Sequence, residues 1–158
     1  MSHEFDEVSN FEIDSETEAA LRRQDEALLL LERLRSEEPF GFSNAKKIPG
    51  QERRDFRRWA MPPGITIEMH DGTRWCKINC SDVGVGGART DFLPSWADGP
   101  TPVRLKGAAG AVIVLSDIMW HGTSANQAGI RFEFLDDEER DFWSGTLIDA
   151  LLARHSLA

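Results

Sequence analysis

The sequence has no long apolar run, and this absence excludes whole classes of protein. None of its 158 residues lies in a stretch approaching the ~20 apolar residues that a membrane-spanning helix needs. The opening stretch, MSHEFDEVSNFEID, carries acids and no apolar centre, so we do not expect it to act as a secretory signal. We therefore expect a cytoplasmic protein without membrane insertion.

Cysteine is scarce, with only Cys76 and Cys80 present. On a strand, their even spacing would place both side chains on one face, at a separation that no disulfide spans. Neither His70 nor His121 stands at a metal-ligand spacing from them. We expect two buried thiols in a reducing compartment and no metal site.

Recognised catalytic motifs are also missing. The chain contains no GxSxG elbow, no P-loop and no HExxH helix. Its many acids fall in the first turns of expected helices and in an acidic arm, where structural roles suffice. We expect a protein that is not an enzyme and that needs no cofactor.

Positive charge is in short supply overall but concentrated in one place. The net charge of −9 and the pI near 4.9 argue against a protein that coats a nucleic-acid polymer or an anionic membrane. Residues 1–45 hold twelve acids against four arginines, whereas residues 46–58, KKIPGQERRDFRR, hold six basic residues against two acids. Any anion site is therefore expected to be local to this basic segment.

Three regions follow from these patterns: an acidic arm (1–45), a basic flexible segment (46–58) and a β domain with a C-terminal helix (59–158). In the arm, helical spacing predicts a helix over about 15–36, capped at Ser15. Four consecutive leucines are wider than one stripe, so this helix must pack either on its own domain or on a second copy as a homodimer.

The β domain is predicted from alternation and turn signals. Ile65–Met69 and Trp75–Cys80 alternate on either side of His70-Asp71-Gly72 and read as a hairpin. Four further runs follow: GGARTDF, TPVRLKG, AVIVLSDIMW and AGIRFEF. Six strands with no helix between them predict a mainly β fold, an antiparallel barrel or sandwich. A final helix, signalled by Asp136 as N-cap and by Glu139, should pack on it.

Two short elements could bind a ligand. The first holds Arg53, Arg54, Arg57 and Arg58, whose guanidinium groups can grip phosphate or the O6 and N7 atoms of guanine; alternatively, it is a solvated stretch paired with the acidic arm. The second is the run DVGVGG over residues 82–87, where an aspartate could accept the N1 and N2 donors of guanine. Its plainer interpretation is a glycine-rich hairpin turn.

Together the two elements resemble the PilZ family of cyclic di-GMP receptors, whose motifs are RxxxR before the first strand and [D/N]xSxxG after it. Arg54 and Arg58 match the first motif, with Arg53 forming an arginine doublet, and Asp82 and Gly87 match the second. The 23 residues between Arg58 and Asp82 fall within the family's interval. The resemblance implies a six-stranded PilZ-like barrel that binds cyclic di-GMP at these residues.

Three further positions bear on this expected site. Gly84 stands where the family has serine, and one missing neutral hydrogen bond costs about 1 kcal/mol, roughly fivefold in affinity. Trp120 resembles a position near the nucleotide, although a tryptophan at a barrel rim is the plainer interpretation. Arg89 projects either toward the same anion or into a cross-strand salt bridge.

The function implied is a non-enzymatic receptor in which cyclic di-GMP bridges the arginine segment and the turn that begins at Asp82. Binding would fix the arm against the barrel and so signal to an unidentified protein partner, in motility, pilus function or exopolysaccharide control. The alternative is a PilZ-like adaptor that binds a protein and no nucleotide, because family members with degenerate motifs act in that way.

Overall fold

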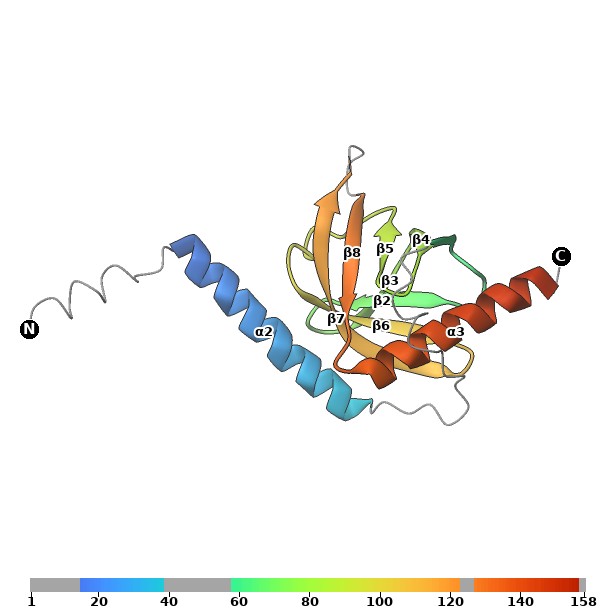
Figure 1. The fold of residues 1–158 in the computed structure, drawn as a ribbon. Helices are drawn as coiled ribbons and strands as arrows, with labels where there is room; N and C mark the ends of the chain where they lie inside the picture. Colours follow the sequence, from blue (N-terminus) through green and yellow to red (C-terminus); the bar gives the residue numbers. More distant parts are fainter. Residues whose placement is uncertain (1–14, 39–57, 123–126, 157–158) are drawn as a thin grey trace, which may run out of the picture.

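A computed structural model describes residues 15–38, 58–122 and 127–156. In these ranges the chain forms a curled antiparallel sheet flanked by one helix from each end of the sequence (Figure 1). The mainly β class with flanking helices is confirmed. Neither of the two described helices is long and apolar enough to cross a membrane.

The sheet has eight strands in the described residues. They are β1 (Trp59–Ala60), β2 (Thr66–His70), β3 (Trp75–Ile78), β4 (Cys80–Val83), β5 (Gly87–Thr90), β6 (Thr101–Gly107), β7 (Gly110–His121) and β8 (Ala128–Glu133). Their order is β1-β4-β5-β8-β7-β6-β2-β3. Only Asn79 separates β3 from β4, yet these strands lie near opposite ends of that order. The sheet therefore curls back on itself where the chain passes from one to the other.

The expected number of six strands is wrong, although all six runs form strands. The run that begins at Trp75 divides at Asn79, because the chain there leaves its pairing with β2 and takes up pairing with β5. Alternation reports which face a side chain occupies and does not report a change of partner. The added strand, β1, has two residues, too few to show a period.

The C-terminal helix, α3 (Asp137–Ser156), begins as its cap signal predicts. The Asp136 Oδ1 atom accepts a hydrogen bond from the Glu139 backbone N–H at 3.0 Å. Glu139 Oε1 in turn accepts from the Leu135 N–H at 3.0 Å. Phe142, Trp143 and Leu147 lie in the core at 0–1% exposure, so the helix packs on the sheet as expected.

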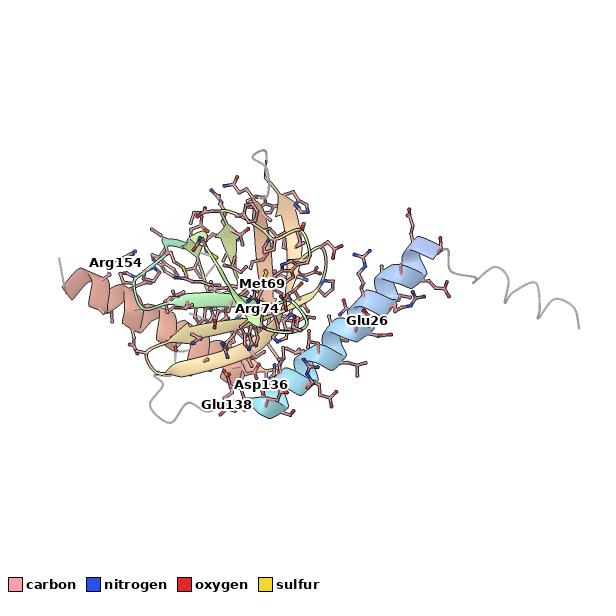
Figure 2. All side chains as sticks on the ribbon, turned by 180° about the vertical axis from the view of Figure 1, so that it is seen from behind. Glu26, Met69, Arg74, Asp136, Glu138 and Arg154 are labelled. Carbon is pink, nitrogen blue, oxygen red and sulfur yellow. The ribbon has the colours of Figure 1, made fainter. Side chains whose placement is uncertain are left out.

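The N-terminal helix, α2 (Ser15–Glu37), matches the predicted range closely. Its C-terminal half packs on the sheet through Ala27 and Leu34, which are buried. Arg35 donates from Nη1 to the Ile113 carbonyl of β7 at 2.7 Å and pairs with Glu139 of α3. The N-terminal end of α2 extends past the sheet, as Figure 2 shows from behind. The helix thus packs on its own domain.

The two thiols differ in environment. Cys80 is buried, and desolvation raises the pKa of its thiol to about 12. Cys76 is only partly buried, because it lies on β3 at the edge of the sheet; the expectation of two buried thiols is correct for Cys80 alone. Within the described ranges, no group of His, Cys, Asp and Glu side chains could hold a metal ion.

Candidate functional site

Arg58 and Asp82, one from each motif, lie in contact. β1 pairs with β4 so that Ala60 is opposite Asp82 and Trp59 is opposite Val83. This register places Arg58, immediately before β1, beside the carboxylate, with Arg58 Nη1 3.1 Å from Asp82 Oδ1. The side chains are 41% and 21% exposed, so the pair adds at most about 1 kcal/mol to stability. Its main effect is to orient both groups.

A row of side chains continues from Asp82 across the neighbouring strands. In the sheet register, Asp82 lies opposite Arg89 of β5. Arg89 lies opposite Gly129 of β8, which in turn lies opposite Trp120 of β7. Arg89 Nε lies 3.5 Å from Asp82 Oδ2, and its guanidinium carbon lies 5.6 Å from the centre of the Trp120 ring. The predicted cross-strand salt bridge of Arg89 therefore exists, and it joins the same cluster.

Gly129 is the residue of this row that was not among the predicted site residues. A Cβ atom there would lie 2.2 Å from Nε1 of the Trp120 ring, so the indole lies directly over the glycine. Trp120 keeps 39% of its surface exposed and can offer an aromatic face to a ligand. The sequence shows a glycine in the run AGIRFEF, but it does not show that Trp120 of β7 lies opposite this glycine.

The glycine run from Gly84 to Gly87 makes a turn at one end of this row. The Gly84 N–H donates to the Gly87 carbonyl at 2.8 Å. The positive-φ glycines among the described residues lie elsewhere in the chain, so this turn does not depend on a left-handed conformation. Gly87 is required for another reason, because a Cβ atom there would lie 2.2 Å from the Ile130 carbonyl oxygen of β8. Asp82 itself lies within β4, which continues to Val83, beyond the end of the strand expected over Trp75–Cys80.

Trp143 of α3 contacts the glycine turn, although the sequence suggested no specific role for this residue. Its indole is fully buried and donates from Nε1 to the Gly84 carbonyl at 3.2 Å. A tryptophan at helical spacing reads only as a core residue, so its hydrogen bond could not be foreseen. The C-terminal helix is therefore attached directly to the motif turn.

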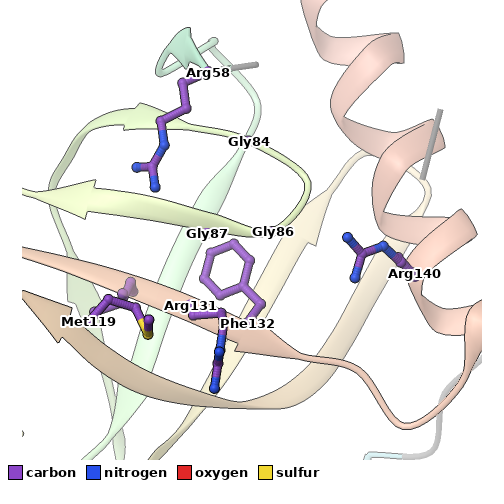
Figure 3. A pocket seen from close by; sticks show the side chains of 9 residues that line it. Arg58, Gly84, Gly86, Gly87, Met119, Arg131, Phe132 and Arg140 are labelled. Atoms are coloured by element: carbon purple, nitrogen blue, oxygen red, sulfur yellow. The ribbon is translucent and has the colours of Figure 1, made fainter. Parts of the chain in front are cut away.

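A cavity of about 280 Å³ opens beside the turn. It is lined by Arg58, Gly84, Gly86, Gly87, Met119, Ile130, Arg131, Phe132 and Arg140. Figure 3 shows Arg58 near the strands that carry the glycines and Arg140 beyond the glycine turn, on α3. Met119 lies where the pairing of β7 with β8 shifts register, between Ile118 and Trp120. No pattern in the sequence singled out Met119, Arg131 or Arg140 as site residues.

The site residues predicted from the sequence thus fall into three groups. Arg58, Asp82, Arg89 and Trp120 form one continuous cluster, and Gly84 and Gly87 form the adjoining turn and line the cavity. Arg53 and Arg54 lie outside the described residues. The described cluster offers a carboxylate between two guanidinium groups, an exposed aromatic face and a glycine floor, a combination suited to a base that carries hydrogen-bond donors and to a nearby anion.

Comparison with known proteins gives matches among solved structures only, since no family model and no curated protein matches. An uncharacterised Legionella protein, Lpg0364, is 13% identical with a TM-score of 0.47, covering 65% of this chain and 100% of its own. The PilZ domain of CeSA from a cellulose-synthesizing bacterium is 16% identical with a TM-score of 0.38, covering 64% and 97%. Borreliella burgdorferi PlzA in complex with c-di-GMP is 16% identical with a TM-score of 0.42, covering 66% and 54%. Solved structures similar to this chain thus include a PilZ domain.

Proposed function

We propose that the protein is a non-enzymatic receptor for cyclic di-GMP. The observation that carries the proposal is the 3.1 Å contact between Arg58 and Asp82, which joins the ends of two motifs that lie 23 residues apart. Arg89 and Trp120 extend the same cluster. The chain as a whole has a net charge of −9, which disfavours binding of a nucleic-acid polymer. A local group of arginines can still bind a small anionic ligand.

Each side chain has a distinct proposed role. Asp82 accepts the N1 and N2 donors of one guanine, because a carboxylate that holds two guanidinium groups still has lone pairs to offer. Arg58 and Arg89 bind phosphate oxygens or the O6 and N7 acceptors. Trp120 stacks on a base, and Arg53 and Arg54 of the basic segment add further charge. Gly84 supplies no hydroxyl, which weakens binding about fivefold.

Isothermal titration calorimetry of the purified full chain with cyclic di-GMP tests the proposal. Hydrogen bonds to charged groups contribute about 1.5–3 kcal/mol, so Arg58→Ala and Asp82→Ala should each weaken binding by about 10- to 150-fold. Arg74→Ala is the matched control, because it removes an exposed arginine of the turn between β2 and β3, which contributes no residue to the Arg58–Asp82 cluster or to the cavity. Absence of heat from the unaltered protein at about 100 μM ligand contradicts the receptor function.

The signal is proposed to pass through the N-terminal arm to a protein partner. Leu21, Leu28 and Leu29 of α2 are 45–67% exposed and form an apolar surface that a partner protein or a second copy can cover. A ligand acts only through its different affinity for two arrangements of the arm. Sedimentation of the protein with and without residues 1–45, each with and without cyclic di-GMP, tests the homodimer and its dependence on the ligand.

A second candidate function is an adaptor that binds a protein and no nucleotide. Gly84 in the place of the family serine favours it, and the exposed leucines of α2 suit it equally. The calorimetric titration separates the two functions, because the adaptor gives no heat with cyclic di-GMP while keeping its fold.

A further inference from the structure

Most of the residues around the cavity belong to neither motif. Arg58, Gly84 and Gly87 are motif residues, but Met119 comes from β7, Arg131 from β8 and Arg140 from α3. The cavity therefore brings together three guanidinium groups from three separated parts of the chain. Asp82, Arg89 and Trp120, which form the row described above, are not among the residues that line the cavity.

The cavity adjoins that row directly. Gly87 precedes Arg89 by two residues on β5, and Arg131 follows Gly129 by two residues on β8. Residues two apart on a strand lie on the same face, about 7 Å from each other. One ligand can therefore contact the row together with Gly87 and Arg131, the cavity residues that share its face.

The volume limits what the cavity can hold. Small-molecule sites typically measure about 300–1,000 Å³, and this cavity, at about 280 Å³, lies just below that range. It can accept one base with part of its sugar but not a whole two-base nucleotide. The second base of such a ligand must then lie outside the cavity, and the exposed Trp120 face is beside it.

The lining suits a purine. The Met119 side chain is 54% exposed, and a thioether packs favourably against an aromatic ring. Arg131 pairs with Glu133 at 3.0 Å, but both side chains are about half exposed, so this pair is weak and leaves other donors of the guanidinium for a ligand. Arg140 lies over the Phe134 ring at 5.6 Å, which orients its guanidinium group beside the cavity.

We propose that this cavity is a second base-binding subsite, which holds one guanine of a two-base cyclic nucleotide. Met119 packs on that base, and Arg131 and Arg140 bind its O6 and N7 acceptors or the adjoining phosphate. The other guanine binds at Asp82 and Trp120. The inference rests on the proposed receptor function and adds to it residues that the two motifs do not contain.

Filling the cavity is the sharpest test. A Cβ atom at Gly86 meets nothing within 4 Å, so Gly86→Leu places a side chain beside the cavity without disturbing the fold. Calorimetry with cyclic di-GMP should show at least a tenfold loss of affinity, with an unchanged melting temperature. Arg140→Ala should weaken binding about 10- to 150-fold, and Met119→Ala about 2- to 13-fold. Arg74→Ala is again the control and should bind as the unaltered protein does.

The outcomes separate this inference from the receptor function. Binding that is lost in Asp82→Ala but stays within twofold in Gly86→Leu, Met119→Ala and Arg140→Ala overturns the subsite and leaves the receptor function intact. Absence of binding by the unaltered protein overturns both. Loss of affinity in the three cavity variants, with melting temperatures and the Arg74→Ala control unchanged, supports the subsite.

Discussion

Replacing Gly87 by alanine should lower the stability of the fold, whereas replacing Gly129 by alanine should lower the affinity for the ligand. The effects differ because different atoms face the two glycines. In Gly87→Ala the new Cβ atom lies 2.2 Å from the Ile130 carbonyl oxygen, whereas real Cβ atoms essentially never come within 3.0 Å of another atom. That oxygen belongs to the backbone of β8 and cannot move without disturbing the pairing of β5 with β8. Overpacking of this kind costs about 1–3 kcal/mol or more, so the melting temperature should fall by about 2–12 °C.

In Gly129→Ala the new Cβ atom also approaches to 2.2 Å, but its neighbour is the Trp120 ring. Trp120 lies near the end of β7 and is 39% exposed, so the ring can swing into solvent at little cost. Folding stability should then change by less than about 1 kcal/mol. The displaced ring no longer lies beside Arg89 or above the site. Since stacking on a base contributes about 1–3 kcal/mol, affinity for cyclic di-GMP should fall about 5- to 150-fold.

Thermal unfolding followed by circular dichroism, together with calorimetry, measures both effects. Gly86→Ala is the internal control for stability, since nothing lies within 4 Å of its new Cβ atom and the expected change is within about 0.5 kcal/mol. Equal melting temperatures for Gly87→Ala and Gly86→Ala would refute the close approach to β8. An unchanged affinity in Gly129→Ala would remove Trp120 from the site.

Three further predictions concern the rest of the molecule. Burial lowers the pKa of His70 below 6.5, so the stability that it contributes is present above pH 6.5 and is lost as the pH falls below it; between pH 7.5 and 5 the melting temperature of the unaltered protein should drop more than that of His70→Asn. Arg35→Ala leaves the Glu139 carboxylate, 3% exposed, without its ion-pair partner and should cost about 3 kcal/mol in urea unfolding. The exposed Arg33→Ala should cost less than about 0.5 kcal/mol. Cys80, with a thiol pKa of about 12, should react with Ellman's reagent only as fast as the protein unfolds.

Much of the fold could be predicted because most strands bury one face. The alternation of β2 around Ile67 and Met69, both at 0–1% exposure, reflects that burial directly. The sequence around Asn79 does not indicate that the chain changes from pairing with β2 to pairing with β5 there. The alternation of Cys76, Ile78 and Cys80 continues through Asn79 without a break. Pairing is a property of two segments, and one segment's pattern does not contain it.

The site was predictable where a motif names its residues and not elsewhere. The motif that contains Arg58 and the motif that contains Asp82 predicted that these residues share a site. The pairing of β1 with β4 brings them into contact. Met119, Arg140 and Trp143 reach the same place from distant parts of the sequence, and no local pattern distinguishes them from ordinary surface or core residues. Only the curled sheet and the packing of α3 bring them to the glycine turn.

The packing of α3 also connects the site to the N-terminal helix within one helical turn. Trp143 donates to the Gly84 carbonyl, and Glu139, four residues earlier, pairs with Arg35 of α2. Residues four apart lie on the same side of a helix, so the glycine turn and α2 are attached to neighbouring points of α3. A ligand that shifts the turn acts on the helix that anchors α2.

Reciprocity makes this connection testable. If binding of cyclic di-GMP alters the docking of α2, loosening α2 must alter the affinity by the same factor. Arg35→Ala removes the anchor without touching the cavity residues, and a coupling of about 1–3 kcal/mol would change the dissociation constant by about 5- to 150-fold. Hydrogen exchange of residues 15–38 with and without ligand gives the converse measurement. Unchanged affinity in Arg35→Ala, with faster exchange in α2 proving that the helix is loosened, would show that the site and the arm act independently.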